Sequence, residues 1–108
     1  MNVLRFSHNW NNKLRNFTFS TIRKHSNEKH QYYASQLDQT FDVKLGETHI
    51  VDAKLVHIAR MLYRDIPFEL KALDTGLLDM DEIDELFKKF GITNDTKVLL
   101  LLFKRDIQ

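Results

Sequence analysis

The chain has 108 residues, of which 43% are hydrophobic and 29% are charged, with one proline and three glycines. This composition predicts a single globular domain over residues 1–108 and excludes a disordered chain. The absence of cysteine excludes a disulfide framework and thiolate chemistry. No long apolar run follows Met1, and the longest one, residues 98–103, is too short to span a bilayer, so we expect a cytoplasmic protein that is not inserted in a membrane.

The net charge of +1 results from an uneven distribution along the chain. Residues 1–30 contain six basic side chains and one acidic side chain, whereas residues 65–85 contain eight acidic side chains and one lysine. One interpretation is a basic face that meets phosphate, with an acidic face elsewhere. The other is that the acidic segments are simply solvated helices.

The first part of the chain predicts two short strands and a long polar connection. Aromatic and β-branched residues alternate between Phe17 and Arg23, which is typical of a strand. The polar segment that follows predicts a surface loop with at most one helical turn around residues 33–37. In chain order we expect a strand over residues 3–7, a short helix or irregular turn over 10–16, a strand over 17–23 and a loop over 24–39.

The middle of the chain predicts a hairpin. Residues 40–45 alternate between apolar and polar side chains, as in a half-buried strand, and Gly46 and Glu47 form a turn. Residues 48–63 fit both a strand pattern and a helical pattern. We favour a long bent strand because β-branched residues are frequent and the preceding turn suggests a hairpin.

The last part of the chain predicts two helices and a central strand. Pro67 suits the first turn of one helix, and Gly76 suits its end. The next helix has Asp79 or Asp81 as its cap and ends at Gly91. Its apolar stripe is expected in the core and consists of Ile83, Leu86, Phe87 and Phe90. Residues 97–103 predict a strand buried on both faces, and 105–108 a tail, so the order of elements favours an α+β fold.

Thr21 and Arg23 are the first candidate site residues. On an extended chain, side chains two residues apart point to the same face. A hydroxyl beside a guanidinium suits a polar or anionic ligand, because the guanidinium offers a planar fork of donors. The alternative is an arginine at a strand edge that pairs with one of the many acidic side chains.

The sequence resembles the ASCH domain family, which belongs to the PUA-like superfamily of small β-barrels. The resemblance runs from about residue 6 to residue 103 and rests on Phe-Ser-Thr-Ile-Arg at 19–23, Asp-Thr-Gly at 74–76, Asp-Glu-Ile at 81–83 and Leu-Phe at 86–87. It implies a small mixed β-barrel with two or three short helices packed across it. It also implies a cleft that takes RNA or a nucleotide-like ligand, lined by Thr21 and Arg23, with Asp74 near its rim.

The same resemblance raises a hydrolase as an alternative function. Some small members of the family hydrolyse the acetyl amide of N4-acetylcytidine with a lysine three residues before the threonine, the threonine itself and a glutamate before the helix. Here Thr18 occupies the lysine position, and the glutamate position falls near Asp74 or Thr75. The resemblance therefore supplies no complete catalytic set and only the weak candidates Thr21, Lys24 and Asp74, unless Lys13 or Lys24 reaches in from elsewhere.

A mixture of basic and aromatic residues predicts contact with RNA, because cations neutralise phosphates and aromatic rings stack on bases. The candidates for this contact are Arg15, Lys24, Trp10, Tyr32 and Tyr33, with His25, Lys29 and His30 nearby. The alternative is that the aromatic rings are buried and the charges belong to a solvated loop.

Neither the histidine spacings nor the rest of the sequence predicts a metal site or a cofactor. His25 and His30 are five residues apart and His49 and His57 are eight apart, and neither spacing is that of a recognisable zinc site. A third function, a protein–protein interaction module, is suggested by the acidic helical face over residues 79–85. RNA or nucleotide binding at Thr21 and Arg23 is the leading hypothesis, and we lean against an enzyme.

Overall fold

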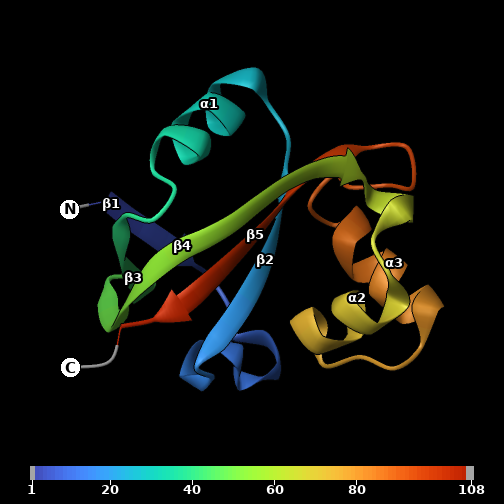
Figure 1. The fold of residues 1–108 in the computed structure, drawn as a ribbon. Helices are drawn as coiled ribbons and strands as arrows, with labels where there is room; N and C mark the ends of the chain where they lie inside the picture. The colour runs from blue at the N-terminus through green and yellow to red at the C-terminus, as the bar shows by residue number, and fades with distance from the viewer. Residues whose placement is uncertain (1, 107–108) are drawn as a thin grey trace.

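The computed structural model describes residues 2–106, which form a five-stranded mixed sheet with helices beside it (Figure 1). The strands are β1 (Asn2–Phe6), β2 (Thr18–Lys24), β3 (Thr40–Leu45), β4 (Thr48–Leu62) and β5 (Lys97–Arg105). The α-helices are α1 (Asn27–Ser35), α2 (Phe68–Thr75) and α3 (Met80–Lys88), and the 3-10 helices are η1 (Trp10–Arg15) and η2 (Tyr63–Asp65). The predicted α+β class is confirmed. None of the helices within residues 2–106 is long and apolar enough to cross a bilayer.

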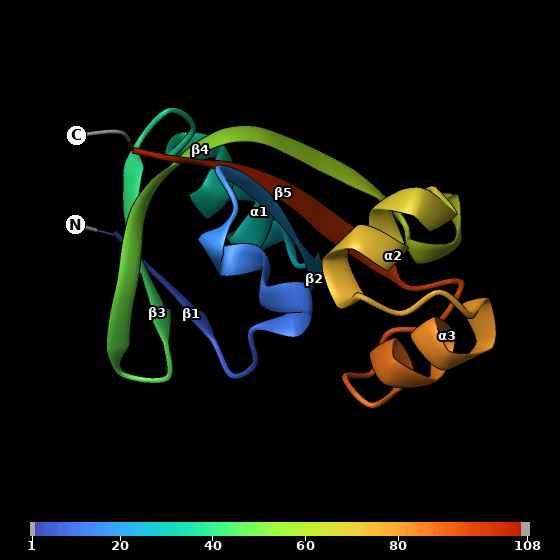
Figure 2. The same cartoon turned by 90° about the horizontal axis from the view of Figure 1, so that it is seen from below.

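The strands follow the spatial order β1-β3-β4-β5-β2. β1 lies parallel to β3, and the other neighbouring strands are antiparallel. β5 lies between β4 and β2, as its continuous apolar run predicts. The long strand predicted after Gly46 is confirmed as β4, whose pairing with β5 shifts register between Leu55 and His57. A register shift of this kind bends a strand, and β4 curves over the sheet in Figure 2.

The sheet is not closed, so the predicted barrel is not confirmed. β1 and β2 are its two edges, and no ladder of backbone hydrogen bonds joins them within the described residues. Side chains occupy the space between the edges instead. The guanidinium carbon of Arg23 lies 5.0 Å from the centre of the Phe6 ring, and Nη2 of Arg23 donates to the carbonyl oxygen of Arg5 at 2.8 Å. Arg23 thus connects the two edges by a side-chain contact.

Two hydrophobic clusters form on opposite faces of the sheet. One includes Leu4, Phe19 and Phe41 and fills the concave side of the sheet. The other includes Ile22 and Phe87 and lies between the sheet and α2 and α3. Alternate residues of β2 and β5 enter different clusters because successive side chains of a strand point to opposite faces. Each fully buried aliphatic side chain contributes roughly 1.5–3 kcal/mol to folding.

The prediction of a loop over residues 24–39 is wrong at its centre, where the chain forms helix α1. Ser26 caps this helix by accepting a hydrogen bond from the backbone N–H of Lys29, at 3.1 Å. The helix has no buried residue, so it carries no apolar stripe that would reveal it in the sequence. The predicted tail also begins too early, because β5 extends through Arg105, and residues 107–108 lie outside the described residues.

Candidate functional site

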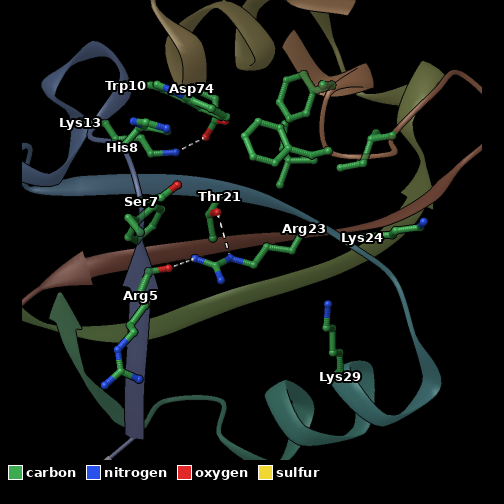
Figure 3. A pocket seen from close by; sticks show the side chains of 15 residues that line it. Arg5, Ser7, His8, Trp10, Lys13, Thr21, Arg23, Lys24, Lys29 and Asp74 are labelled. Carbon is green, nitrogen blue, oxygen red and sulfur yellow. Dashed lines mark hydrogen bonds and ion pairs between the residues drawn. The ribbon is translucent and has the colours of Figure 1, made fainter. Parts of the chain in front are cut away.

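A cavity of about 260 Å³ opens where β1, η1, β2 and α3 meet (Figure 3). Its polar lining includes Lys13, Thr21, Arg23 and Asp74, and further basic side chains come from Arg5, Lys24 and Lys29. Its aromatic lining comes from Phe6, Trp10, Phe87 and Phe90. The cavity therefore combines several cations, one buried carboxylate and several rings.

Thr21 and Arg23 project from the same face of β2 into this cavity. The Arg23 Nε donates to the Thr21 hydroxyl oxygen at 3.3 Å. The Thr21 side chain is buried and the Arg23 side chain is half-buried. No carboxylate within the described residues forms an ion pair with Arg23, so a simple surface ion pair does not explain it. Burial lowers the pKa of Arg23, but a guanidinium starts so high that it stays charged at neutral pH.

Lys13 and Asp74 form a buried ion pair in the cavity wall. The Lys13 Nζ lies 2.8 Å from the Asp74 Oδ1, and the two residues are only 4% and 2% exposed. The Ser20 hydroxyl donates to the same oxygen at 3.1 Å. Burial lowers the pKa of Lys13, and the nearby charge of Asp74 opposes that effect.

The turn of η1 positions Lys13 beside α2. Asn11 and Asn12 have φ angles of 56° and 53°, in the left-handed region that asparagine tolerates better than most residues. The Asn11 side chain donates to the carbonyl oxygen of Leu73 at 2.9 Å, which ties η1 to the end of α2. Gly76 follows α2 with φ 79°, and a Cβ there would lie 3.1 Å from the Cβ of Asn11. Glycine thus permits the close approach that brings Lys13 to Asp74.

Trp10 and two phenylalanines form the aromatic wall. The Trp10 ring lies edge-on to Phe87, with 6.1 Å between ring centres, and to Phe90, with 5.6 Å. The prediction that Phe90 is a core residue is wrong, since it is 49% exposed and lines the cavity. The physical reason is that α3 ends at Lys88, so Phe90 does not continue the buried helical stripe.

The structure brings some of the predicted site residues together and leaves others apart. Thr21, Arg23, Lys24, Asp74 and Trp10 all line the cavity. Three of the predicted RNA-binding residues, Arg15, Tyr32 and Tyr33, are not among its lining residues.

The two tyrosines are engaged on α1 instead. The Tyr32 hydroxyl donates to the Asn2 side chain at 2.9 Å. The Tyr33 ring stacks on Phe41, with ring centres 6.1 Å apart. Both rings therefore lie against β1 or β3 and not in the cavity. Arg15 is exposed at the end of η1.

Lys13 is the site residue that sequence reasoning places least well. It stands in a polar segment with no motif around it, and 61 residues separate it from Asp74. Nothing in the local pattern pairs the two side chains. The buried residues of α2 are Lys71, Asp74 and Thr75, so Asp74 does not stand out from an apolar face, and no signal in the sequence points to Lys13 as its partner.

A second polar group lies on the β3–β4 hairpin, outside the cavity. Ligand atoms of Asp42, His49 and Asp52 lie within 4.8 Å of one another. His49 forms a hydrogen bond with Asp42, which lowers the pKa of that carboxyl, and Lys44 also lies 3.8 Å from Asp42. These contacts already satisfy the carboxylate of Asp42, and the group is consistent with a polar contact that stabilises the hairpin.

The arrangement of strands and helices matches that of a solved protein. The crystal structure of an ASCH domain from Lactobacillus crispatus JV V101 superposes with a TM-score of 0.63, over 88% of this chain and 68% of that chain. This chain has the ASCH-domain fold. Sequence identity to the ASCH domain is 14%, so the similarity is one of fold alone. Models of protein families gave no match to the sequence, and no curated protein gave a significant match.

Proposed function

We propose that this ASCH-fold domain binds RNA or a nucleotide-like ligand in the cavity around Thr21 and Arg23. The observation that carries the proposal is that cations and aromatic rings line the same small cavity. Nucleotides offer both an anionic backbone and a flat ring, and proteins bind unpaired nucleotides by combining basic groups with aromatic surfaces.

Arg23 supplies donors that are already oriented. A guanidinium has five N–H donors, and within the described residues Arg23 gives one to Thr21 and one to the carbonyl of Arg5. These two contacts fix the plane of the group while other N–H bonds remain for a ligand. Because the side chain is half-buried, its hydrogen bonds to an anion are screened less than those of an exposed arginine.

Lys13 and Asp74 supply a donor and an acceptor side by side. The edges of nucleobases carry hydrogen-bond donors and acceptors in adjacent positions. A lysine ammonium retains further N–H donors after it binds one carboxylate oxygen. The pair therefore suits the polar edge of a base that enters between Trp10 and Phe6, whose ring centres lie 5.8 Å and 5.1 Å from the Lys13 ammonium.

The size of the cavity favours one nucleotide unit. Pockets for drug-sized ligands begin at about 300 Å³, and this cavity measures about 260 Å³. A duplex cannot enter such a space, so we expect the ligand to be a free nucleotide or an unstacked nucleotide of a single strand.

The first experiment replaces Arg23 with alanine and measures binding of a short single-stranded RNA through the fluorescence of Trp10, the one tryptophan of the chain. We expect Arg23→Ala to weaken binding by about tenfold or more and to reduce its salt dependence. Arg64→Ala is the matched control, because Arg64 is exposed and forms an ion pair with Asp95 away from the cavity lining.

A thermal melt of each variant separates loss of binding from loss of fold, since Arg23 also contacts the edge strand β1. Unchanged affinity and unchanged salt dependence in folded Arg23→Ala would contradict the role of Arg23.

A second candidate, an amidohydrolase acting on a modified nucleoside such as N4-acetylcytidine, has one specific observation in its favour. The Lys13 amine lines the same cavity as the Thr21 hydroxyl. In the family that the sequence resembles the lysine stands at the position of Thr18. Burial lowers the pKa of Lys13. A lowered pKa favours the neutral amine, which is the form that can act as a base.

The hydrolase is tested by incubating the protein with N4-acetylcytidine and measuring cytidine and acetate, the two products of amide hydrolysis. Thr21→Val and Lys13→Met serve as matched variants. Release by the unchanged protein that both variants abolish, while a thermal melt shows each variant to be folded, would support catalysis, and no release above buffer would leave the binding function alone.

A further inference from the structure

The cavity has two chemically different ends (Figure 3). At one end lie Lys13, Asp74 and Trp10, where the carboxylate balances the ammonium. At the other end lie Lys24 and Lys29, with Arg23 between the two groups. The end with Lys13 and Asp74 has balanced charges and suits a neutral polar ring. The end with Lys24 and Lys29 is positively charged.

Lys24 and Lys29 line the second end from separate elements, and Figure 3 shows their flexible side chains reaching it in different directions. Lys24 is the last residue of β2, and Lys29 lies in the first turns of α1, whose Ser26 cap fixes the start of the helix. Both lysines are exposed, and neither forms an ion pair with a carboxylate anywhere in residues 2–106. Two ammonium groups beside one cavity without a counter-charge favour an anion.

The surroundings of this end are also positive. Burial lowers the pKa of the neighbouring His25, and the charges of Lys97 and Arg60 lower it further. The buried Nε2 of His25 has no hydrogen-bond partner. Glu28 is the nearby acidic residue in sequence, and it is exposed and enters no ion pair within the part of the chain that the structure describes.

The backbone after α3 lies close to Lys24. A Cβ on Gly91 would be 3.4 Å from the Lys24 Nζ, and Gly91 has φ 76°, which favours glycine. The ammonium therefore lies against the connection that also carries Phe90 and Ile92, two other lining residues of the cavity.

We propose that Lys24 and Lys29 bind the phosphate of a nucleoside phosphate whose base occupies the end formed by Lys13, Asp74 and Trp10. This inference rests on the proposed function and adds to it a direction of binding and a requirement for phosphate. The shared chemistry is that of a nucleoside 5′-phosphate, whether it is a free mononucleotide or one unit of an RNA strand.

The test compares the four nucleosides with their 5′-monophosphates, again through Trp10 fluorescence. The unchanged protein should bind at least one monophosphate about tenfold more tightly than its nucleoside, because charge-assisted hydrogen bonds to phosphate are the stronger kind. Lys24→Gln/Lys29→Gln should remove this preference and leave the affinity for the nucleoside unchanged.

A matched control has the same change of net charge elsewhere. Lys54 and Lys104 are exposed cross-strand neighbours on β4 and β5 and are not among the lining residues. Lys54→Gln/Lys104→Gln should keep the full preference for the monophosphate. An equal loss in both double variants would mean that overall charge, not this pair, attracts phosphate, and it would overturn the inference.

The remaining outcomes separate this inference from the proposed function. Equal binding of nucleosides and monophosphates would overturn the phosphate site and leave a base-binding cavity. Absence of binding by nucleosides, monophosphates and a single-stranded RNA tetramer would overturn the proposed function itself. Tighter binding of the tetramer than of any monophosphate, lost in Lys24→Gln/Lys29→Gln, would identify an RNA strand as the source, and the reverse order a free nucleotide.

Discussion

Two buried lysines, Lys13 and Lys71, stand in contrasting surroundings. Lys13 is 4% exposed, pairs with Asp74 and lines the cavity, whereas Lys71 is 2% exposed and is not among the lining residues. The Lys71 Nζ lies 3.9 Å from the centre of the Tyr63 ring and has no carboxylate within ion-pair distance in residues 2–106. Burial lowers the pKa of both lysines.

The contrast shows that burial of a charge does not by itself mark a site. Lys71 lies in the packed region between α2, η2 and α3, where the Tyr63 hydroxyl donates to Asp84 at 2.9 Å. Its ammonium is stabilised by an aromatic face, as in other cation–π contacts. Lys13 differs because it lines the cavity together with Thr21, Arg23 and Trp10. Access to the cavity, rather than burial, is the property that makes Lys13 a candidate for ligand binding.

The largest effect should come from breaking the Lys13–Asp74 pair. Lys13→Met leaves the Asp74 carboxylate buried without its partner, so the free energy of unfolding should fall by about 3–5 kcal/mol. The double variant Lys13→Met/Asp74→Leu should recover most of that loss while ligand binding stays weak. Urea unfolding measures the first effect and Trp10 fluorescence the second. Full recovery of binding in the double variant would show that the pair acts only in folding.

A smaller effect is expected from the matched substitution Lys71→Met. Methionine keeps most of the volume and removes the charge, so the cation–π contact with Tyr63 is lost but a buried ammonium is also removed. The free energy of unfolding should change by about 1 kcal/mol or less, and RNA binding should not change. Weaker RNA binding in a folded Lys71→Met protein would contradict the interpretation that only Lys13 takes part in binding.

The smallest effect is a pH dependence of stability. The folded state lowers the pKa of Lys71, so the unfolded chain binds more protons between that pKa and the ordinary lysine value of 10.5. The free energy of unfolding of the unchanged protein should therefore rise, relative to Lys71→Met, as the pH increases through this window. The pKa of Tyr63 is raised mainly by burial and further by Asp84. Above about pH 10 this shift lowers the free energy of unfolding with rising pH in both proteins.

Urea unfolding of both proteins at several alkaline pH values measures the difference. A difference that stays constant with pH would mean that the burial of Lys71 does not change its protonation.

Local patterns predict much of the fold. Three local signals predict their elements directly: the apolar run of β5, the glycine after α2 and the aspartate cap of α3. These signals work because the local pattern and the tertiary environment agree. Helix α1 fails the same reasoning because it buries no residue, and its tyrosines contact the sheet without forming a periodic stripe.

The candidate site divides in a similar way. Thr21 and Arg23 could be predicted because strand geometry places them on one face. The family resemblance places Asp74 near the cleft, but its contact with Lys13 could not be predicted, since it depends on how η1 meets α2 and no local pattern encodes a pair 61 residues apart. Helical spacing predicts Phe90 in the core, but the helix ends before it. The open sheet likewise could not be predicted, since no local pattern shows that the edges β1 and β2 meet through Arg23 and Phe6 rather than through a ladder of backbone hydrogen bonds.

The most direct test of the central claim is a nuclear magnetic resonance titration of the full chain with a single-stranded RNA tetramer. If the cavity is the binding site, the largest chemical-shift changes should occur at Thr21, Arg23, Trp10 and Lys13, and these changes should reach a plateau as the RNA concentration rises. Changes confined to Arg15, Tyr32 and Tyr33 would place binding on the surface outside the cavity. That result, or no change at any residue, would contradict the account.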